Sequence, residues 1–144
     1  MDTAPFVEIR VTQRYGAPPD KVFNAWIEPA AAGQWLFATA SRPVTRLEIE
    51  ARAGGSFCFV ERIGGVDIEH VGEYIEIARP RRLVFTLSDR GRSPGQTRVS
   101  VEIVPATAGC EVTLVHEGVP PDQASRVEGR WAGMLYGLGT LLDR

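Results

Sequence analysis

Two histidines, His70 and His116, are the side chains of this sequence best suited to acid–base chemistry near neutral pH. His70 follows Glu69, and His116 precedes Glu117. Neighbouring residues of a regular strand point to opposite faces of the sheet, so neither glutamate can orient the imidazole beside it. Both histidines are predicted to face the concave side of a sheet. There each could act as a general base, could bind a ligand, or could be hydrogen-bonded within the wall of the core.

Large aromatic side chains recur at positions that are also predicted to face inward. They could line a ligand cavity, but aromatic residues in such a pattern also fill ordinary cores. Tyr74 and Trp131 are the better candidates for ligand contact, because each combines a large apolar ring with a polar atom. The predicted cavity residues are Trp26, Trp35, Phe57, Phe59, His70, Tyr74, Phe85, His116, Trp131 and Leu135.

Several motifs with a strong catalytic signature are not found. The chain has no His-Glu-x-x-His pair, no Cys-x-x-Cys pair and no phosphate-binding lysine in a glycine loop. Gly137-Leu138-Gly139 lacks the third glycine and the preceding strand of a dinucleotide site. We therefore expect no cofactor and no metal, and we favour binding over catalysis. An enzyme of the cyclase, dehydratase or hydrolase type that uses His70 or His116 stays open as an alternative.

Length and composition are those of an ordinary globular domain. The 144 residues are 44% hydrophobic and 24% charged, with a net charge of −2, so we expect one domain over 1–144 with its core at about 7–142. The small net charge argues against nucleic-acid binding, and no run of about 20 apolar residues could span a membrane. We therefore expect a cytoplasmic protein. Cys58 and Cys110 are predicted to be reduced thiols, which could pair only if their strands were neighbours.

The N-terminal part of the chain is predicted to form one strand followed by two helices. Apolar residues alternate with polar ones over 7–12, which predicts a strand buried on one face. A helix is expected to begin at Pro18 and to end at Glu28, because prolines favour the first turn and disfavour helix at the residue before them. A short second helix is predicted from Ala30 to Trp35.

From residue 44 to residue 116 the hydrophobic period changes to two, which predicts six consecutive antiparallel strands. Gly64-Gly65 is expected to form a hairpin turn, because glycine readily takes positive φ. The alternation slips by one residue near Gly72, which predicts a β-bulge or a sharp bend. The segment 88–95 is rich in glycine, proline and arginine and is expected to be a mobile hairpin loop.

The last predicted helix begins near Pro120 and carries a broad apolar face that must be buried. This face consists of Val127, Trp131, Met134, Leu135, Leu138, Leu141 and Leu142. Gly129, Gly133 and Gly137 lie on a different side, and each costs about 1 kcal/mol of helix propensity relative to alanine. Close approach of another chain or of a neighbouring loop would offset that cost. The alternative is that nothing offsets this cost and the helix is simply weaker in propensity.

The predicted elements follow the order of the helix-grip fold of the START-like, or Bet v-like (SRPBCC), superfamily. In that order one strand is followed by two short helices, six further strands and a long C-terminal helix. Within it, the chain resembles the activator of 90-kDa heat shock protein ATPase homologue 1-like family. The residues that carry this resemblance are 17–26, 54–57, 72–74, 80–86, 112–118 and Trp131 with the leucines that follow it.

The resemblance implies an α+β fold in which a curved antiparallel sheet wraps around the C-terminal helix and leaves a cavity between them. Members of the wider superfamily bind lipids, hormones or polyketides in that cavity. The favoured function is therefore non-catalytic binding of a small hydrophobic or amphipathic ligand. A protein-interaction or co-chaperone-like module is the alternative, and a homodimer is a further expectation, with no nucleic-acid or membrane partner.

Overall fold

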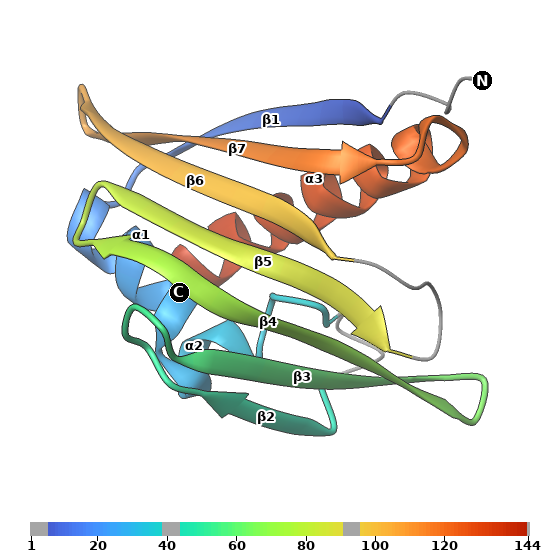
Figure 1. Ribbon diagram of the computed structural model, residues 1–144. Helices are drawn as coiled ribbons and strands as arrows, with labels where there is room; N and C mark the ends of the chain where they lie inside the picture. The colour runs from blue at the N-terminus through green and yellow to red at the C-terminus, as the bar shows by residue number, and fades with distance from the viewer. Residues whose placement is uncertain (1–5, 39–43, 91–95, 144) are drawn as a thin grey trace.

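A curved antiparallel sheet covers one long helix in the computed structural model, which describes residues 6–38, 44–90 and 96–143 (Figure 1). Within these residues the sheet has seven strands in the order β1-β7-β6-β5-β4-β3-β2. The helix-grip fold expected from the sequence is confirmed. The elements are β1 (Val7–Tyr15), α1 (Pro19–Ile27), α2 (Pro29–Ala32), β2 (Arg46–Ile49), β3 (Ser56–Ile63), β4 (Val66–Ala78), β5 (Arg82–Arg90), β6 (Thr97–Ala106), β7 (Gly109–Val119), the 3₁₀ helix η1 (Pro121–Gln123) and α3 (Ala124–Leu142).

The two short helices begin at prolines and lie behind the sheet, at the left and lower left of the view (Figure 1). α1 ends before Pro29, as expected, because the residue that precedes a proline disfavours the helical conformation. α2 is shorter than predicted and ends at Ala32. The chain then continues in turns through Trp35, whose indole Nε1 donates a hydrogen bond to the carbonyl oxygen of Ala25 at 3.0 Å. This bond fastens the turns to α1.

β4 bends through a bulge close to the predicted position. The pairing of β4 with β5 shifts register between Tyr74 and Glu76, and Ile75 is the extra residue. Tyr74 is buried while Ile75 is exposed, so the extra residue of the bulge accounts for the one-residue shift in the hydrophobic alternation. Gly72 is needed for close packing, because a Cβ atom there would lie 1.9 Å from the carbonyl oxygen of Thr86. The bend lets the sheet curl around its core.

β5 extends further than the sequence predicts. Ser88, Asp89 and Arg90 pair with β4 as part of the strand, so the expected loop begins later than residue 88. The rest of that loop, 91–95, lies outside the described residues. This segment contains the pattern Gly-x-Ser-x-Gly. The described elements on either side of it, β5 and β6, are antiparallel strands, whereas a nucleophile elbow stands between a strand and a helix.

α3 buries the predicted apolar face against the concave side of the sheet. Trp131, Met134, Leu135, Leu138 and Leu142 are buried, and Val127 and Leu141 pack at the margin of the core. The three glycines of the opposite side, 129, 133 and 137, are different. Apart from the adjoining residues and the backbone of α3 itself, no described atom lies within 4 Å of a Cβ built on any of them, so no described loop covers that side of α3.

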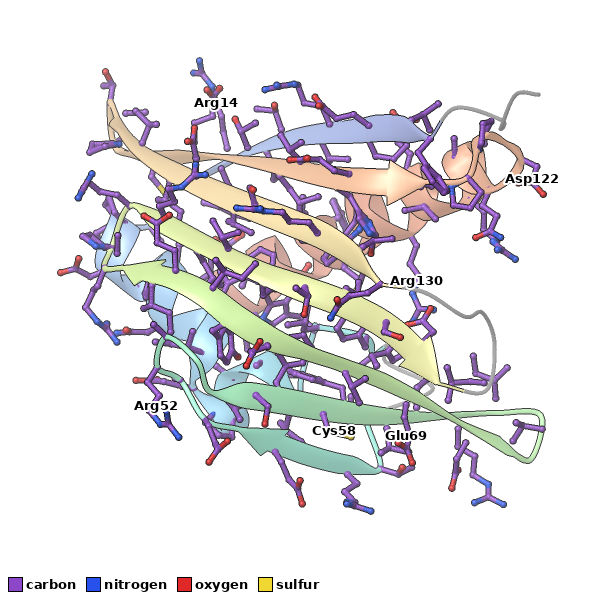
Figure 2. The ribbon with its side chains drawn as sticks, in the orientation of Figure 1. Arg14, Arg52, Cys58, Glu69, Asp122 and Arg130 are labelled. Carbon is purple, nitrogen blue, oxygen red and sulfur yellow. The ribbon has the colours of Figure 1, made fainter. Side chains whose placement is uncertain are left out.

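The two cysteines lie on different parts of the sheet. Cys58 is on β3 and Cys110 is on β7, with β4, β5 and β6 between them, so their thiols are not linked. Figure 2 shows Cys58 near Glu69, which lies on the neighbouring strand β4. Among the described helices, none has both the length and the apolar character of a membrane span.

Candidate functional site

The predicted cavity residues of the sheet and of α1 pack against one another and leave little space. We call this region the aromatic chamber; it is lined by Trp26, Leu36, Phe37, Phe57, Phe59, Tyr74, Leu83 and Phe85. Its rings meet edge to face or at a tilt, with centroids 5.4 Å apart for Phe57 and Phe85. The remaining void is about 10 Å³, close to the space that one water molecule needs. The binding of a ligand among these residues stays a prediction.

The other predicted cavity residues surround the chamber or lie away from it. Trp35 and Trp131 pack on Trp26, with ring centroids 4.6 and 6.2 Å away. Leu135 is fully buried, and its carbonyl oxygen accepts a hydrogen bond from the hydroxyl of Tyr15 at 2.7 Å. Burial raises the pKa of the Tyr74 hydroxyl above its ordinary value. These side chains are primarily part of the hydrophobic core.

One buried polar atom of the chamber has no partner. Trp26 is 1% exposed, and its indole Nε1 is the only fully buried side-chain nitrogen or oxygen among the described residues that lacks a hydrogen bond. The indoles of Trp35 and Trp131 both donate to an acceptor. Leaving such a donor unsatisfied costs about 1–3 kcal/mol.

An open pocket of about 180 Å³ lies at one end of the sheet, and we call it the end pocket. It is formed by the ends of β5, β6 and β7 together with η1 and the first turn of α3, so it lies between the last helix and the sheet. Its walls combine apolar and polar side chains. Its lining includes Leu87, Asp89, Thr97, His116, Val119 and Val127.

His116 forms part of the pocket wall and is held by a chain of hydrogen bonds. The indole Nε1 of Trp131 donates to its Nδ1 at 3.0 Å, and its Nε2 lies 2.7 Å from the hydroxyl oxygen of Thr97. That hydroxyl donates in turn to the carbonyl oxygen of Leu87 at 3.1 Å. The chain assigns the hydrogen of His116 to Nε2, because Nδ1 accepts from Trp131 and the only hydroxyl hydrogen of Thr97 is used.

The electrostatic environment keeps His116 neutral. Burial lowers its pKa to about 4 from 6.5, and the negative charge of Asp89 opposes this shift only in part. Both ring nitrogens are already hydrogen-bonded, so neither offers a lone pair to a molecule in the pocket. His116 is therefore hydrogen-bonded within the wall, one of the three roles that the sequence left open.

His70 lies in a second polar network, which we call the charge cluster: Glu61, His70, Asp89 and Arg130. Its Nε2 is 2.9 Å from Oε1 of Glu61, and its Nδ1 is 2.7 Å from Oδ1 of Asp89. Arg130, which reaches down from α3, donates from Nη2 to the same Glu61 oxygen at 2.6 Å (Figure 2). Three strands and a helix therefore meet at this cluster.

The charge cluster is well shielded from water at its centre. Glu61 is 1% exposed and His70 is 3% exposed, whereas the side chains of Asp89 and Arg130 remain partly exposed. Burial by itself would raise the pKa of Glu61, but the hydrogen bonds and charges of Arg130 and His70 outweigh it and lower that pKa. Two carboxylates face the two nitrogens of His70, so both contacts are hydrogen bonds only when both nitrogens carry hydrogen.

Phe37 separates the charge cluster from the aromatic chamber. Its ring stacks on His70, with centroids 4.2 Å apart and planes 9° from parallel. Its backbone has φ of 55°, a conformation that costs a bulky residue about 1–3 kcal/mol. The backbone N–H donates to Sδ of Met134 at 3.1 Å, and the guanidinium carbon of Arg130 lies 6.0 Å from the ring centroid.

Four residues of these networks are not among those predicted from the sequence: Phe37, Glu61, Asp89 and Arg130. Glu61 carries a usable signal, because it has the same strand parity as Phe57 and Phe59 and so must face inward despite its charge. Asp89 falls in the segment expected to be a loop, so its position on a strand could not be predicted. The described residues contain no group of three or more His, Cys, Asp or Glu side chains placed to hold a metal ion.

Comparison with known proteins places this geometry in a family. The match to one family spans residues 16–143, and its description is Activator of Hsp90 ATPase homolog 1-like protein. Protein CV1439 from Chromobacterium violaceum has a similar structure, with a TM-score of 0.87 at 25% identity over 95% of this chain and 97% of that chain. The AHSA1-like protein from Aeromonas hydrophila has a TM-score of 0.82 at 18% identity over 95% of this chain and 92% of that chain. No curated protein matches the chain. The chain therefore belongs to the Activator of Hsp90 ATPase homolog 1-like family.

Proposed function

We propose that this protein binds a small amphipathic molecule in the end pocket, between the last helix and the concave sheet. Family membership supports a ligand-binding or co-chaperone-like module in general. The observation that carries the finer proposal is an open pocket of about 180 Å³ with apolar walls and a polar side. An apolar cavity of about 150 Å³ can hold benzene, whereas drug-sized ligands need roughly 300 Å³ or more. The pocket therefore suits a molecule with a single ring.

The pocket lining indicates how such a molecule would be oriented. Leu87, Val119 and Val127 provide apolar surface for its ring. The hydroxyl of Thr97 and the carboxylate of Asp89 provide polar atoms for one hydrogen-bonding group. Because both ring nitrogens of His116 are hydrogen-bonded within the wall, the geometry supports binding better than proton transfer.

A fragment titration followed by NMR tests this proposal. The probes are phenol, benzyl alcohol, benzylamine and benzoate, and the readout is the indole N–H signal of Trp131, which reports on its bond to His116. We expect at least one probe to shift this signal in a saturable way. Val127→Phe should narrow the pocket and weaken that binding about tenfold or more, by steric exclusion.

A matched control uses the same change at an exposed position. Val104→Phe lies on β6 at an exposed site outside the pocket lining and should leave the affinity unchanged. No saturable shift with any probe would contradict the proposal. Equal affinities for the wild type and for Val127→Phe would contradict it as well.

A second candidate function is contact with an ATPase of the Hsp90 type, which the family description suggests. The observation that favours it is the uncovered side of α3, where Tyr136 is 72% exposed beside Gly133 and Gly137. We expect the protein to raise the ATP turnover of such a chaperone, and Tyr136→Ser to reduce the effect while Val104→Ser does not. Unchanged turnover on adding the wild-type protein would exclude this candidate.

A further inference from the structure

We infer that the end pocket selects a molecule that donates a hydrogen bond, such as a phenol, an aromatic alcohol or an aromatic amine, and discriminates against one that can only accept. The inference rests on the proposed function, because it names the chemical class of the ligand for the same pocket. It follows from the direction of the hydrogen bonds that run along the pocket wall. These bonds join His116, Thr97 and Leu87, and all three residues line the pocket.

The direction of this chain of hydrogen bonds is fixed at both of its ends. At one end the indole Nε1 of Trp131 can only donate, and it donates to Nδ1 of His116. At the other end the carbonyl oxygen of Leu87 can only accept, and it receives the hydroxyl hydrogen of Thr97. The 2.7 Å bond between them therefore runs from Nε2 of His116 to the hydroxyl oxygen of Thr97. Every side-chain hydrogen of the chain is used within it.

One lone pair of the chain is left, and it belongs to Thr97. A hydroxyl group has one hydrogen and two lone pairs. The hydrogen goes to Leu87, and one lone pair receives the hydrogen of His116. The oxygen lies between atoms of these two lining residues, at 3.1 and 2.7 Å, so it is part of the same wall. The second lone pair can accept a hydrogen bond from a ligand.

Asp89 gives the wall the same preference. Its carboxylate accepts hydrogen bonds and cannot donate them, and its Oδ1 is held 2.7 Å from Nδ1 of His70. Its negative charge reaches His116, whose pKa it acts to raise. A ligand hydrogen carries partial positive charge and is favoured beside this carboxylate, whereas a ligand lone pair is disfavoured. The other polar side chains of the lining can both donate and accept, so they impose no direction: Ser88, Gln96 and Gln123.

Three probes with one ring and one substituent test this inference. Phenol can donate, benzonitrile can only accept, and fluorobenzene has the shape of phenol without the hydrogen. A purely apolar pocket would favour fluorobenzene, because phenol loses its hydrogen bonds to water on entry. We expect phenol to bind about three- to tenfold more tightly than either of the others, the range that one hydrogen bond provides. The readout is the indole N–H signal of Trp131 during titration.

Thr97→Val removes the accepting oxygen and keeps the shape of the side chain. The preference for phenol should fall about threefold or more in this variant. Thr45→Val is the matched control, because the Thr45 hydroxyl also donates to a backbone carbonyl, that of Val60 at 3.2 Å, but lies outside the pocket lining. It should leave the preference unchanged. The same preference in Thr97→Val as in the wild type would overturn the inference.

The wild-type protein provides a second measurement, which remains valid if Thr97→Val fails to fold. The ring nitrogen signals of His116 should show the hydrogen on Nε2 and none on Nδ1. A hydrogen on Nδ1 would reverse the chain of hydrogen bonds and would overturn the inference.

The probes also separate this inference from the proposed function. Saturable binding of all three probes with equal affinity would overturn the donor preference and would leave the end pocket standing as a binding site. No saturable binding of any probe would contradict the proposed function, and the ligand class would fall with it.

Discussion

The indole Nε1 of Trp131 on α3 lies 3.0 Å from Nδ1 of His116 on β7. This bond joins the central helix to the sheet and occupies the one nitrogen through which a neutral His116 could act as a base. The same contact therefore holds the helix against the sheet and leaves His116 without a free nitrogen that could act as a general base. Its consequences for stability can be measured.

The first prediction concerns pH. The pKa of His116 is about 4 in the folded protein and about 6.5 when unfolded, so the unfolded state binds the extra proton between these values. The stability that the neutral ring contributes is complete above about pH 6.5 and is lost as pH falls toward 4. Between pH 7.5 and pH 5 the free energy of unfolding should fall by about 2 kcal/mol from this source. Urea unfolding at the two pH values measures the loss.

The control for this prediction is His116→Gln, which cannot titrate in that range. Its free energy of unfolding should change less with pH than that of the wild type, by about the same 2 kcal/mol. Working at pH 5 and above limits the contribution of Glu61, whose lowered pKa makes its stabilisation disappear at more acidic pH. Identical pH dependences for the two proteins would show that His116 is not buried in its neutral form.

The second prediction concerns the charge cluster. Glu61→Gln keeps the size of the side chain but removes the charge that faces both Arg130 and His70. We expect a loss of about 3 kcal/mol in the free energy of unfolding, at the lower end for a broken buried pair, because Arg130 retains contact with water. Glu48→Gln is the matched control on exposed β2 and should cost at most about 1 kcal/mol. Equal effects of the two changes would contradict a buried, energetically coupled Glu61.

The third prediction compares the effect of the same substitution, glycine to alanine, at two positions. Gly133→Ala should stabilise the protein by about 0.5–1 kcal/mol, because the added methyl meets no described atom beyond its own stretch of helix and alanine favours helix. Gly72→Ala should destabilise it strongly, because the methyl would collide with the carbonyl oxygen of Thr86 and the ring of Phe57. Thermal unfolding of both variants checks the opposite signs. Destabilisation by Gly133→Ala would instead indicate that something covers this side of α3.

The fourth prediction concerns thiol reactivity. Cys58 is partly exposed, whereas Cys110 is buried and its burial raises the pKa of the thiol above its usual range. Under native conditions a disulfide reagent should therefore modify Cys58 and should reach Cys110 only after unfolding. Cys58→Ser should remove the native reaction. Rapid modification of Cys110 in the folded protein would contradict the burial of β7 against the core.

Local patterns explain why so much of the fold was predictable. Alternation with a period of two identified the strands from residue 44 onward, and the spacing of the α3 leucines and Trp131 identified the buried helix face. Both patterns reflect which side of an element is removed from water, and that information lies within a few adjacent residues. The bulge was predictable to within a few residues of Gly72 for the same reason.

The sequence alone determined the order of elements, the inward faces and the family resemblance, because the buried side of each element produces a periodic pattern of apolar residues along the chain. Only the tertiary structure decided which polar residues meet. Glu61, His70, Asp89 and Arg130 come from four elements, and their contacts depend on strand register and on the position of α3 above the sheet. It also decided that aromatic rings fill the chamber while an open pocket lies at the end of the sheet, because free volume depends on how side chains pack in three dimensions.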